Sequence, residues 1–442
     1  MKHKTVDLCG HADVKIIDGM TTYFSKRLIR MKIPYMLLLL FITLLPARAQ
    51  RNEILSSRIA SLQVVAGDNW MSPPVIMLNG EDPIHISFDD LTHEYHRYCY
   101  KLEHCEADWQ PSTELFVSDF CEGFADGNTI DDLVESINTN TLYTHYSLTL
   151  PNSKCRMKIS GNYRLTVYDE NDENNIMFTA CFMVVEPLMG VSLNVTTNTD
   201  IDINNAHQQV SMEVNYGPLK VTDMGTQIHT VVMQNGRWDD ARLDAKPQFI
   251  LGDGLRWNHC PDYIFNGGNE YRKFEMLDMN HTTMGLEKMT WDGNNYHAYI
   301  WPDEPRPSYV YDEDANGSFY IRNSDNIEND YASEYAYVHF TLKAPRADGE
   351  VFINGTWTND RFLHEYQMTY NDETQRYEAS VFLKQGYYSY QYLLLSTDRQ
   401  AVPFPTEGNF FQTENSYQGL VYFKAIGQRT DRLVGYQHIK TR

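Results

Sequence analysis

The sequence predicts an all-β protein made of tandem β-sandwich domains that follow an N-terminal signal peptide. Three observations lead to this fold class. Aromatic residues make up 13% of the chain and include 30 tyrosines, a composition that favours strands over helices. Short segments of alternating apolar and polar residues recur along the chain, separated by clusters of Gly, Asn, Asp and Pro. The length of 442 residues exceeds one ordinary domain, so we expect two or three.

The first 49 residues have the layout of a secretory signal peptide. Basic residues precede an apolar run at 36–42, and the segment Pro46-Ala47-Arg48-Ala49 supplies small residues for cleavage before Gln50. Met31 is an alternative start, since residues 1–30 add nothing that such a signal needs. The apolar run is too short for a stable membrane span, and no cysteine at the cleavage point could carry a lipid. We therefore expect a soluble exported protein with no direct membrane insertion.

The rest of the chain is strongly acidic. The formal net charge is -22, and residues 1–49 hold eight Lys or Arg against three Asp or Glu, which leaves -27 (29 basic, 56 acidic) for the remainder. A surface of that charge repels nucleic-acid phosphates and anionic lipid headgroups. We therefore predict no nucleic-acid partner.

The first predicted domain spans residues 50–187. Tyr98, Tyr100 and Leu102 alternate with residues of opposite parity, the pattern of a strand with one packed face. Further strands are expected at 84–88, 144–150, 163–167 and 178–184. The segment 54–65 fits either a short helix or an opening strand, and the polar segment 127–140 predicts a long loop.

Removal of the signal peptide leaves six cysteines, an even number that suits disulfides in an oxidising compartment: Cys99, Cys105, Cys121, Cys155, Cys181 and Cys260. Cys99 and Cys105 would lie about 20 Å apart on an extended strand, so they could not bond to each other. A metal site is the alternative role for part of this region, which contains His93, His96, His104 and Cys105. No recognised zinc spacing occurs there, and we predict no metal site.

The second predicted domain spans residues 188–333. Alternation predicts strands at 191–195, 210–214 and 228–232, and Asn235-Gly236 after the last of these is a strong hairpin signal. Gly267-Gly268 lacks the Lys-Ser/Thr that follows in a phosphate-binding loop, so an ordinary turn is expected.

The third predicted domain spans residues 334–426, and the basic tail at 427–442 is expected to be flexible. Strands are predicted at 336–342, 351–353, 377–383 and 388–394, with a turn at 384–386 in which Gly386 supplies a positive φ. The motifs GEVFINGTWTND and RYEASVFLKQGYYSYQYLL resemble early-set immunoglobulin-like domains that occur as glycogen- and starch-binding modules. That resemblance makes Trp357 an alternative glycan platform, although packing is the favoured interpretation.

Five further motifs, FDDL, HCEADW, SGNY, QNGRWD and FNGGNEYR, are spread over nearly the whole mature chain. Together they resemble the periplasmic plug protein of the type IX secretion system of Bacteroidetes-type bacteria. The resemblance implies a periplasmic protein, held at the outer membrane by a protein partner, that seals the mouth of the translocon barrel. It assigns no contact residues, so the distinctive positions are named without an assigned role, and a turn or core role is as good an interpretation of each as partner contact: Asp89, Asp90, Asp108, Trp109, Trp238, Asn269 and Glu270.

Two kinds of function compete, an interaction protein and a carbohydrate protein. A glycosidase needs two carboxylates about 5–10 Å apart, and several are available: Asp89, Asp90, Glu103, Glu106 and Asp108. With 59 acidic residues, however, such pairs arise by chance, and no G-x-S-x-G nucleophile motif occurs. We therefore predict no enzyme, no catalytic residue and no cofactor. An exported carbohydrate-binding protein is the alternative.

Overall fold

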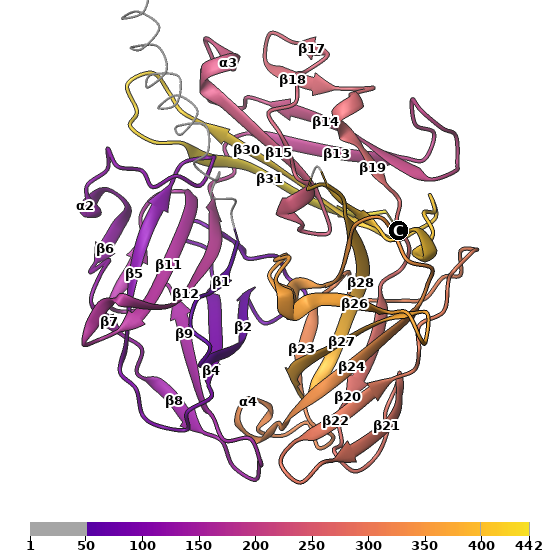
Figure 1. Ribbon diagram of the computed structural model, residues 1–442. Coiled ribbons are helices and arrows are strands. Elements are labelled where there is room, and N and C mark those ends of the chain that lie inside the picture. The colour runs from indigo at the N-terminus through magenta and orange to yellow at the C-terminus, as the bar shows by residue number, and fades with distance from the viewer. Residues whose placement is uncertain (1–50, 398, 442) are drawn as a thin grey trace, which may run out of the picture. The chain divides into compact units, whose positions relative to one another are not determined.

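The computed structural model describes residues 51–397 and 399–441, all within one compact unit, and Figure 1 shows their arrangement. The predicted signal peptide and the alternative start at Met31 lie outside these residues. The described chain consists mainly of strands, with helices of only three or four residues, which confirms the all-β prediction. None of the helices in this part of the chain has the length and apolar character needed to cross a membrane.

The first sandwich packs two sheets, with strand orders β1-β12-β11-β5-β7 and β2-β4-β9-β8, while β3 pairs with β12 and β6 with β10. Its elements are β1 (Glu53–Ile54), β2 (Ile59–Ala66), β3 (Val75–Met77), β4 (Ile84–Asp90), β5 (Tyr98–Cys105), α2 (Val117–Phe120), β6 (Cys121–Gly123), β7 (Asn128–Thr129), β8 (Asp132–Glu135), β9 (Thr144–Leu150), β10 (Cys155–Met157), β11 (Gly161–Asp169) and β12 (Asp172–Val185). Segment 54–65 thus supplies a strand, and the predicted loop at 127–140 is wrong in part, because β7 and β8 extend the two sheets.

The second sandwich is built from two segments that are far apart in the sequence. Its sheets have orders β13-β14-β18-β17 and β16-β15-β30-β31, with β19 paired to β14. The elements are β13 (Gly190–Thr196), β14 (His207–Asn215), α3 (Met224–Gln227), β15 (Ile228–Gln234), β16 (Arg242–Leu243), β17 (Phe249–Ile250), β18 (Gly254–Trp257), β19 (Ile264–Asn266), β30 (Ser416–Phe423) and β31 (Arg432–Lys440). Asn235 and Gly236 both have positive φ and turn the chain after β15, as the hairpin signal indicates.

The third sandwich is one continuous sheet of order β20-β28-β25-β26-β27-β24-β22-β21, to which β23 and β29 add by pairing with β28. The sheet folds over at β26, which pairs with β25 through its first residues and with β27 through its last. The elements are β20 (Arg272–Met276), β21 (Leu286–Trp291), β22 (Tyr296–Ile300), β23 (Phe319–Ile321), α4 (Asn329–Ala332), β24 (Tyr335–Lys343), β25 (Glu350–Asn354), β26 (Gln367–Asn371), β27 (Arg376–Lys384), β28 (Gly386–Leu395) and β29 (Ala401–Pro403).

The strand pairing does not follow the predicted order of the second and third domains. Strands at 272–300, expected in the second domain, pair into the third sandwich, and β30, expected in the third, pairs with β15 of the second. The prediction of a flexible tail is wrong, because β31 lies in a sheet and buries Leu433 and Val434. We propose boundaries of 51–187 for the first sandwich, 188–266 with 416–440 for the second, and 272–403 for the third.

The predicted turn at 384–386 is also wrong. Strands β27 and β28 have different partners and do not pair with each other, so no hairpin forms there. Gly386 lies in extended backbone opposite Ile321 of β23. A Cβ at this position would lie 2.3 Å from the carbonyl oxygen of Tyr320, so the glycine is required by the close approach of β23.

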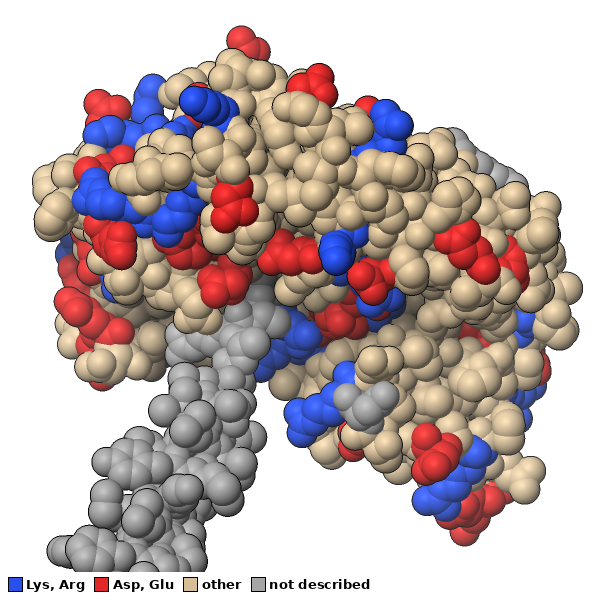
Figure 2. All heavy atoms as spheres, turned by 90° about the horizontal axis from the view of Figure 1, so that it is seen from above, with Lys and Arg blue, Asp and Glu red and all other residues tan. Residues whose placement is uncertain are grey.

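On the face seen in Figure 2, acidic and basic side chains are interspersed among uncharged ones. The acidic excess of the sequence is therefore not collected into one patch on that face, a pattern that favours solubility over a single electrostatic docking surface.

Candidate functional site

The five motifs of the sequence analysis converge on the contacts between the three sandwiches. HCEADW, SGNY and QNGRWD meet where the first sandwich contacts the second; FDDL lies against the third sandwich; and FNGGNEYR leads from the second sandwich into the third. We call these contacts the first–second, first–third and second–third junctions.

An apolar cluster forms the centre of the first–second junction. Trp109 is 2% exposed and lies on the tight turn after β5, where its φ of +65° is unusual for a large side chain. Its carbonyl oxygen accepts a hydrogen bond from Arg164 Nη2 at 2.9 Å, and its ring meets Trp238 of the second sandwich. The cluster comprises Cys105, Trp109, Cys181, Met183 and Val185 from the first sandwich, and Val231, Met233, Leu420, Tyr422 and Leu433 from the second.

Reciprocal hydrogen bonds surround this apolar cluster. The Asp431 carboxylate accepts from the Ala107 amide at 3.0 Å, and the Glu106 carboxylate accepts from the Asp431 amide at 2.9 Å. Tyr422 donates to Asn162 Oδ1 of the SGNY motif at 2.8 Å. Asp108, by contrast, is exposed and accepts from the Gln110 amide within the turn, so its role there is local.

Asp89 is the centre of the first–third junction and is completely buried. Its Oδ2 accepts from Lys384 Nζ at 2.5 Å and from the Tyr335 hydroxyl at 2.6 Å, both on the third sandwich. Its Oδ1 lies 2.7 Å from Nδ1 of His145 on the neighbouring strand β9. The Lys384 ammonium also lies 4.0 Å from the centre of the Tyr143 ring, a cation–π contact.

The charges of this buried pair stabilise each other. Burial pushes the pKa of Asp89 upward, but the Lys384 ammonium and the hydrogen bond from His145 outweigh it and leave the pKa below its ordinary value. Burial also lowers the pKa of Lys384, and the Asp89 carboxylate opposes that shift. Each group therefore depends on its partner, because either charge alone in this position would be buried without compensation.

Asp90 makes its contacts within the first sandwich, because successive residues of a strand point to opposite faces and Asp89 already faces the third sandwich. Its carboxylate accepts from the Tyr98 hydroxyl at 2.5 Å and from the amide and hydroxyl of Thr92. The adjacent aspartates of FDDL thus divide between an internal contact and a contact with the third sandwich.

The second–third junction contains a buried group of charged side chains. Asn269 donates to the carbonyl oxygen of Glu407 at 2.7 Å, and Tyr309 donates to Glu270 Oε1 at 2.5 Å. The Glu407 carboxylate pairs with Arg272 and with Arg306, and its side chain is 3% exposed. These contacts fix the two chain segments that connect the second and third sandwiches.

A cavity of about 190 Å³ lies between the junctions, and its walls come from all three sandwiches. Apolar side chains such as Leu62, Met233 and Phe319 alternate around it with amides and other polar groups. Burial, together with the nearby Asp239 carboxylate, raises the pKa of the lining residue Asp360 to about 6. Within the described ranges, no cluster of His, Cys, Asp or Glu has the arrangement of a metal site.

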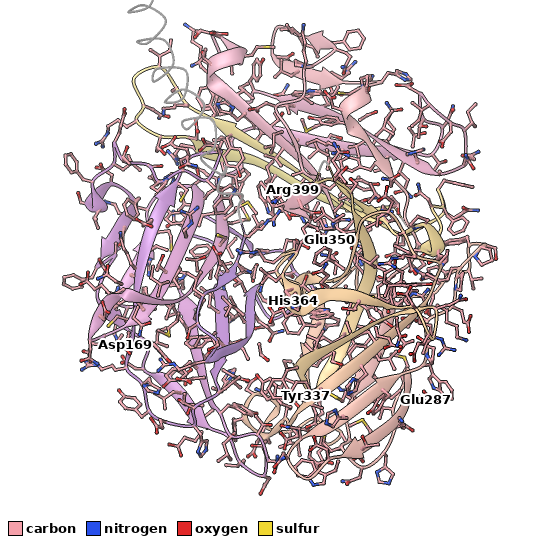
Figure 3. All side chains as sticks on the ribbon, in the orientation of Figure 1. Asp169, Glu287, Tyr337, Glu350, His364 and Arg399 are labelled. Carbon is pink, nitrogen blue, oxygen red and sulfur yellow. The ribbon has the colours of Figure 1, made fainter. Side chains whose placement is uncertain are left out.

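Trp357, the alternative glycan platform, is 7% exposed and packs inside the third sandwich against Phe340, Tyr366 and Tyr388. Its indole Nε1 donates to the carbonyl oxygen of Ser389 at 3.1 Å. Side chains of this sandwich that do reach solvent, such as Glu350 and His364, are labelled in Figure 3. The buried ring offers no face on which a sugar could stack.

All six cysteines considered in the sequence analysis are buried thiols. Cys99 and Cys105 are the second and the last residue of the single strand β5. Several junction residues were missed by sequence reasoning: Lys384, Tyr335, His145, Asp431, Arg272 and Glu407. For Lys384 the only signal was a lysine that directly follows an alternating strand, which is equally typical of a solvated turn.

Comparisons with known proteins agree with the motifs. Residues 59–186 match the family model described as the type 9 secretion system plug protein first domain. A crystal structure of a hypothetical protein from Parabacteroides merdae has 40% identity and a TM-score of 0.86, with 88% of this chain and 99% of that chain covered. A partial N-terminal region of an enterococcal surface protein, at 8% identity, has a TM-score of 0.17 over 88% of this chain and 95% of that chain, which supports no likeness. No curated protein matches the sequence.

Proposed function

The chain belongs to the type 9 secretion system plug protein family, and from this premise we propose that it seals the translocon barrel of that system from the periplasmic side. A wide barrel leaves a water-filled lumen that leaks unless a folded protein covers it. In this proposal the protein is exported, stays in the periplasm and reaches the outer membrane only through its barrel partner. It acts by binding and performs no catalysis.

The observation that carries the proposal is the buried connection of the three sandwiches. The carboxylate of Asp89 and the Trp109–Trp238 contact each join two sandwiches, and the Glu407 cluster holds the two chain segments that connect the second sandwich to the third. A body held together in this way resists deformation, because separating any two sandwiches would expose apolar surface or leave a buried charge unpaired. A cover for a large pore needs that property.

Deletion of the gene tests the proposed function. The outer membrane of the deletion strain should admit large antibiotics or dyes that the parent excludes, and simultaneous loss of the barrel should cure the leak. Wild-type protein should restore the seal, and so should Lys154→Ala, which changes an ion pair on the surface whose two side chains are 42% and 66% exposed. Equal permeability of deleted and parental cells, with no barrel recovered in pull-downs, would contradict the proposal.

A further inference from the structure

Two of the six cysteines lie in contact at the edge of the first sandwich. Cys121 begins β6 and Cys155 begins β10, and these two strands pair with each other in antiparallel fashion. The Sγ atoms of the two residues are 3.4 Å apart. Both residues are buried, at 3% and 1% exposure, and both belong to a two-stranded sheet that is separate from the other two sheets of the sandwich.

The local backbone holds the two cysteines close together. Gly123 stands opposite Cys155 with a φ of +93°, and a Cβ on it would lie 2.1 Å from the carbonyl oxygen of Lys154. The side chain of Asn152 accepts from the amides of Lys154 and Cys155 and so fixes the turn that enters β10. The approach of β6 to β10 is therefore built into the chain and does not depend on a bond between the sulfurs.

The chemistry of this pair differs from that of other buried cysteines. A hydrogen bond from the Cys155 thiol lowers the pKa of Cys121 to about 7, so its thiolate forms near neutral pH. Burial instead raises the pKa of Cys105 to about 12 and that of Cys181 to about 11, which keeps both as inert thiols. A thiol that ionises near neutral pH, in contact with a second thiol, favours thiol–disulfide exchange.

We propose that Cys121 and Cys155 close a disulfide in the exported protein. The oxidant is a thiol–disulfide oxidoreductase in its disulfide form. Its sulfur–sulfur bond breaks when the Cys121 thiolate attacks it. The Cys155 thiol then gives up its proton as its sulfur displaces the oxidoreductase from the mixed disulfide, and the departing thiolates of the oxidoreductase take up the protons. Cys121 and Cys155 together lose two protons and two electrons, and the oxidoreductase leaves as a dithiol. The sulfurs need to approach by about 1.4 Å to reach bonding distance.

The bond would fasten a corner of the first sandwich that also contacts the second. Helix α2 runs directly into Cys121, and its Asp119 carboxylate pairs with Arg429 from the connection between β30 and β31 at 2.6 Å. Phe116 and Phe124, which are 72% and 73% exposed, lie on either side of Cys121 in the sequence. A disulfide would keep these exposed rings in place.

Mass spectrometry of the native protein tests the proposal, which rests on the proposed export. Protein from the cell envelope is alkylated during lysis and digested without reduction. A peptide that links Cys121 to Cys155 is expected, and protein that has not been alkylated should have an intact mass two hydrogen atoms below that of the reduced protein. Cys105→Ser should keep the link, whereas Cys121→Ser should abolish it and leave Cys155 alkylated. Recovery of both cysteines alkylated in the wild-type protein would overturn the proposal.

A second measurement distinguishes the ability of the two cysteines to form the bond from the export of the protein to an oxidising compartment. Purified, reduced protein is equilibrated in glutathione redox buffers and the fraction of linked peptide is measured. Oxidation there but not in cells would contradict the proposed export, while failure to oxidise in both would contradict the geometry of the pair. The seal itself is read independently, from the permeability of cells that carry Cys121→Ser with Cys155→Ser.

Discussion

The indole rings of Trp109 and Trp238 meet edge to face, with centroids 5.7 Å apart and planes at 88°. One ring belongs to the HCEADW motif of the first sandwich and the other to the QNGRWD motif of the second. Two motifs that are distant in the sequence thus form a single contact, and their aromatic residues bury the centre of the first–second junction.

Removal of either tryptophan should destabilise the whole body. Trp109→Ala should lower the free energy of unfolding by about 3–5 kcal/mol, since it leaves a large cavity among buried side chains. In a double-mutant cycle with Trp238→Ala, the two changes should couple by about 0.5–1.5 kcal/mol, as expected for an aromatic pair. Urea unfolding measures both quantities, and strictly additive losses would show that the rings act separately.

Asp89→Asn should cost about 3–5 kcal/mol, because it leaves the Lys384 ammonium buried without its carboxylate. The double change to Asp89→Asn with Lys384→Met should cost less than the sum of the single changes, since it removes both charges. Thermal unfolding of the four proteins gives the comparison. The surface change Asp131→Asn, in an ion pair whose side chains are 66% and 42% exposed, is the control and should have little effect.

His104 should make the protein sensitive to mild acid. Burial lowers its pKa to about 4, against the opposing influence of the Ser160 carbonyl and Glu106. The unfolded chain takes up a proton near pH 6.5 that the folded protein refuses, so stability falls as the pH drops from about 6.5 toward 4 and is reduced by about 2 kcal/mol at pH 5. Unfolding midpoints at pH 7, 6 and 5 should show this slope. It should be shallower in His104→Gln and unchanged in His281→Gln, whose side chain is 80% exposed.

Trp357→Ala should lower the melting temperature without any effect on glucan binding, because the ring is a core residue of the third sandwich. Trp301→Ala is the matched control, since that side chain is 59% exposed and its loss should be tolerated. Differential scanning calorimetry and retention on a maltooligosaccharide column measure the two properties. Loss of retention at an unchanged melting temperature would favour the carbohydrate alternative.

The sequence was most informative where one strand face is apolar. Tyr98, Tyr100 and Leu102 are all buried and Lys101 is exposed, as alternation predicts, whereas Cys99 on the opposite face is buried too. Alternation identifies the buried face of a strand but not the strand with which it pairs. The pairing of β15 with β30 could therefore not be predicted from the sequence. The run Leu433-Val434 was the available signal that the basic tail contains a strand, and the flanking arginines obscured it.

The polar junctions were predictable only in part. The motifs drew attention to Asp89, Trp109, Trp238, Asn269 and Glu270, all of which lie at the junctions. Their partners could not be inferred, because a buried ion pair such as Asp89–Lys384 depends on the docking of two separately folded sheets. The alternation of residues in a strand predicts which of its side chains are buried, but it does not identify the neighbouring sheet that buries a charged side chain.

The pairing of β15 with β30 also determines the order in which the protein assembles. A chain that emerges from its N-terminus can complete the first sandwich early, because all the strands of that sandwich lie before residue 186. The third sandwich lies wholly between residues 272 and 403 and can close next. The second sandwich remains incomplete until β30 pairs with β15 and β31 pairs with β30, so a chain in which these two strands have not yet docked exposes an open sheet edge to aggregation.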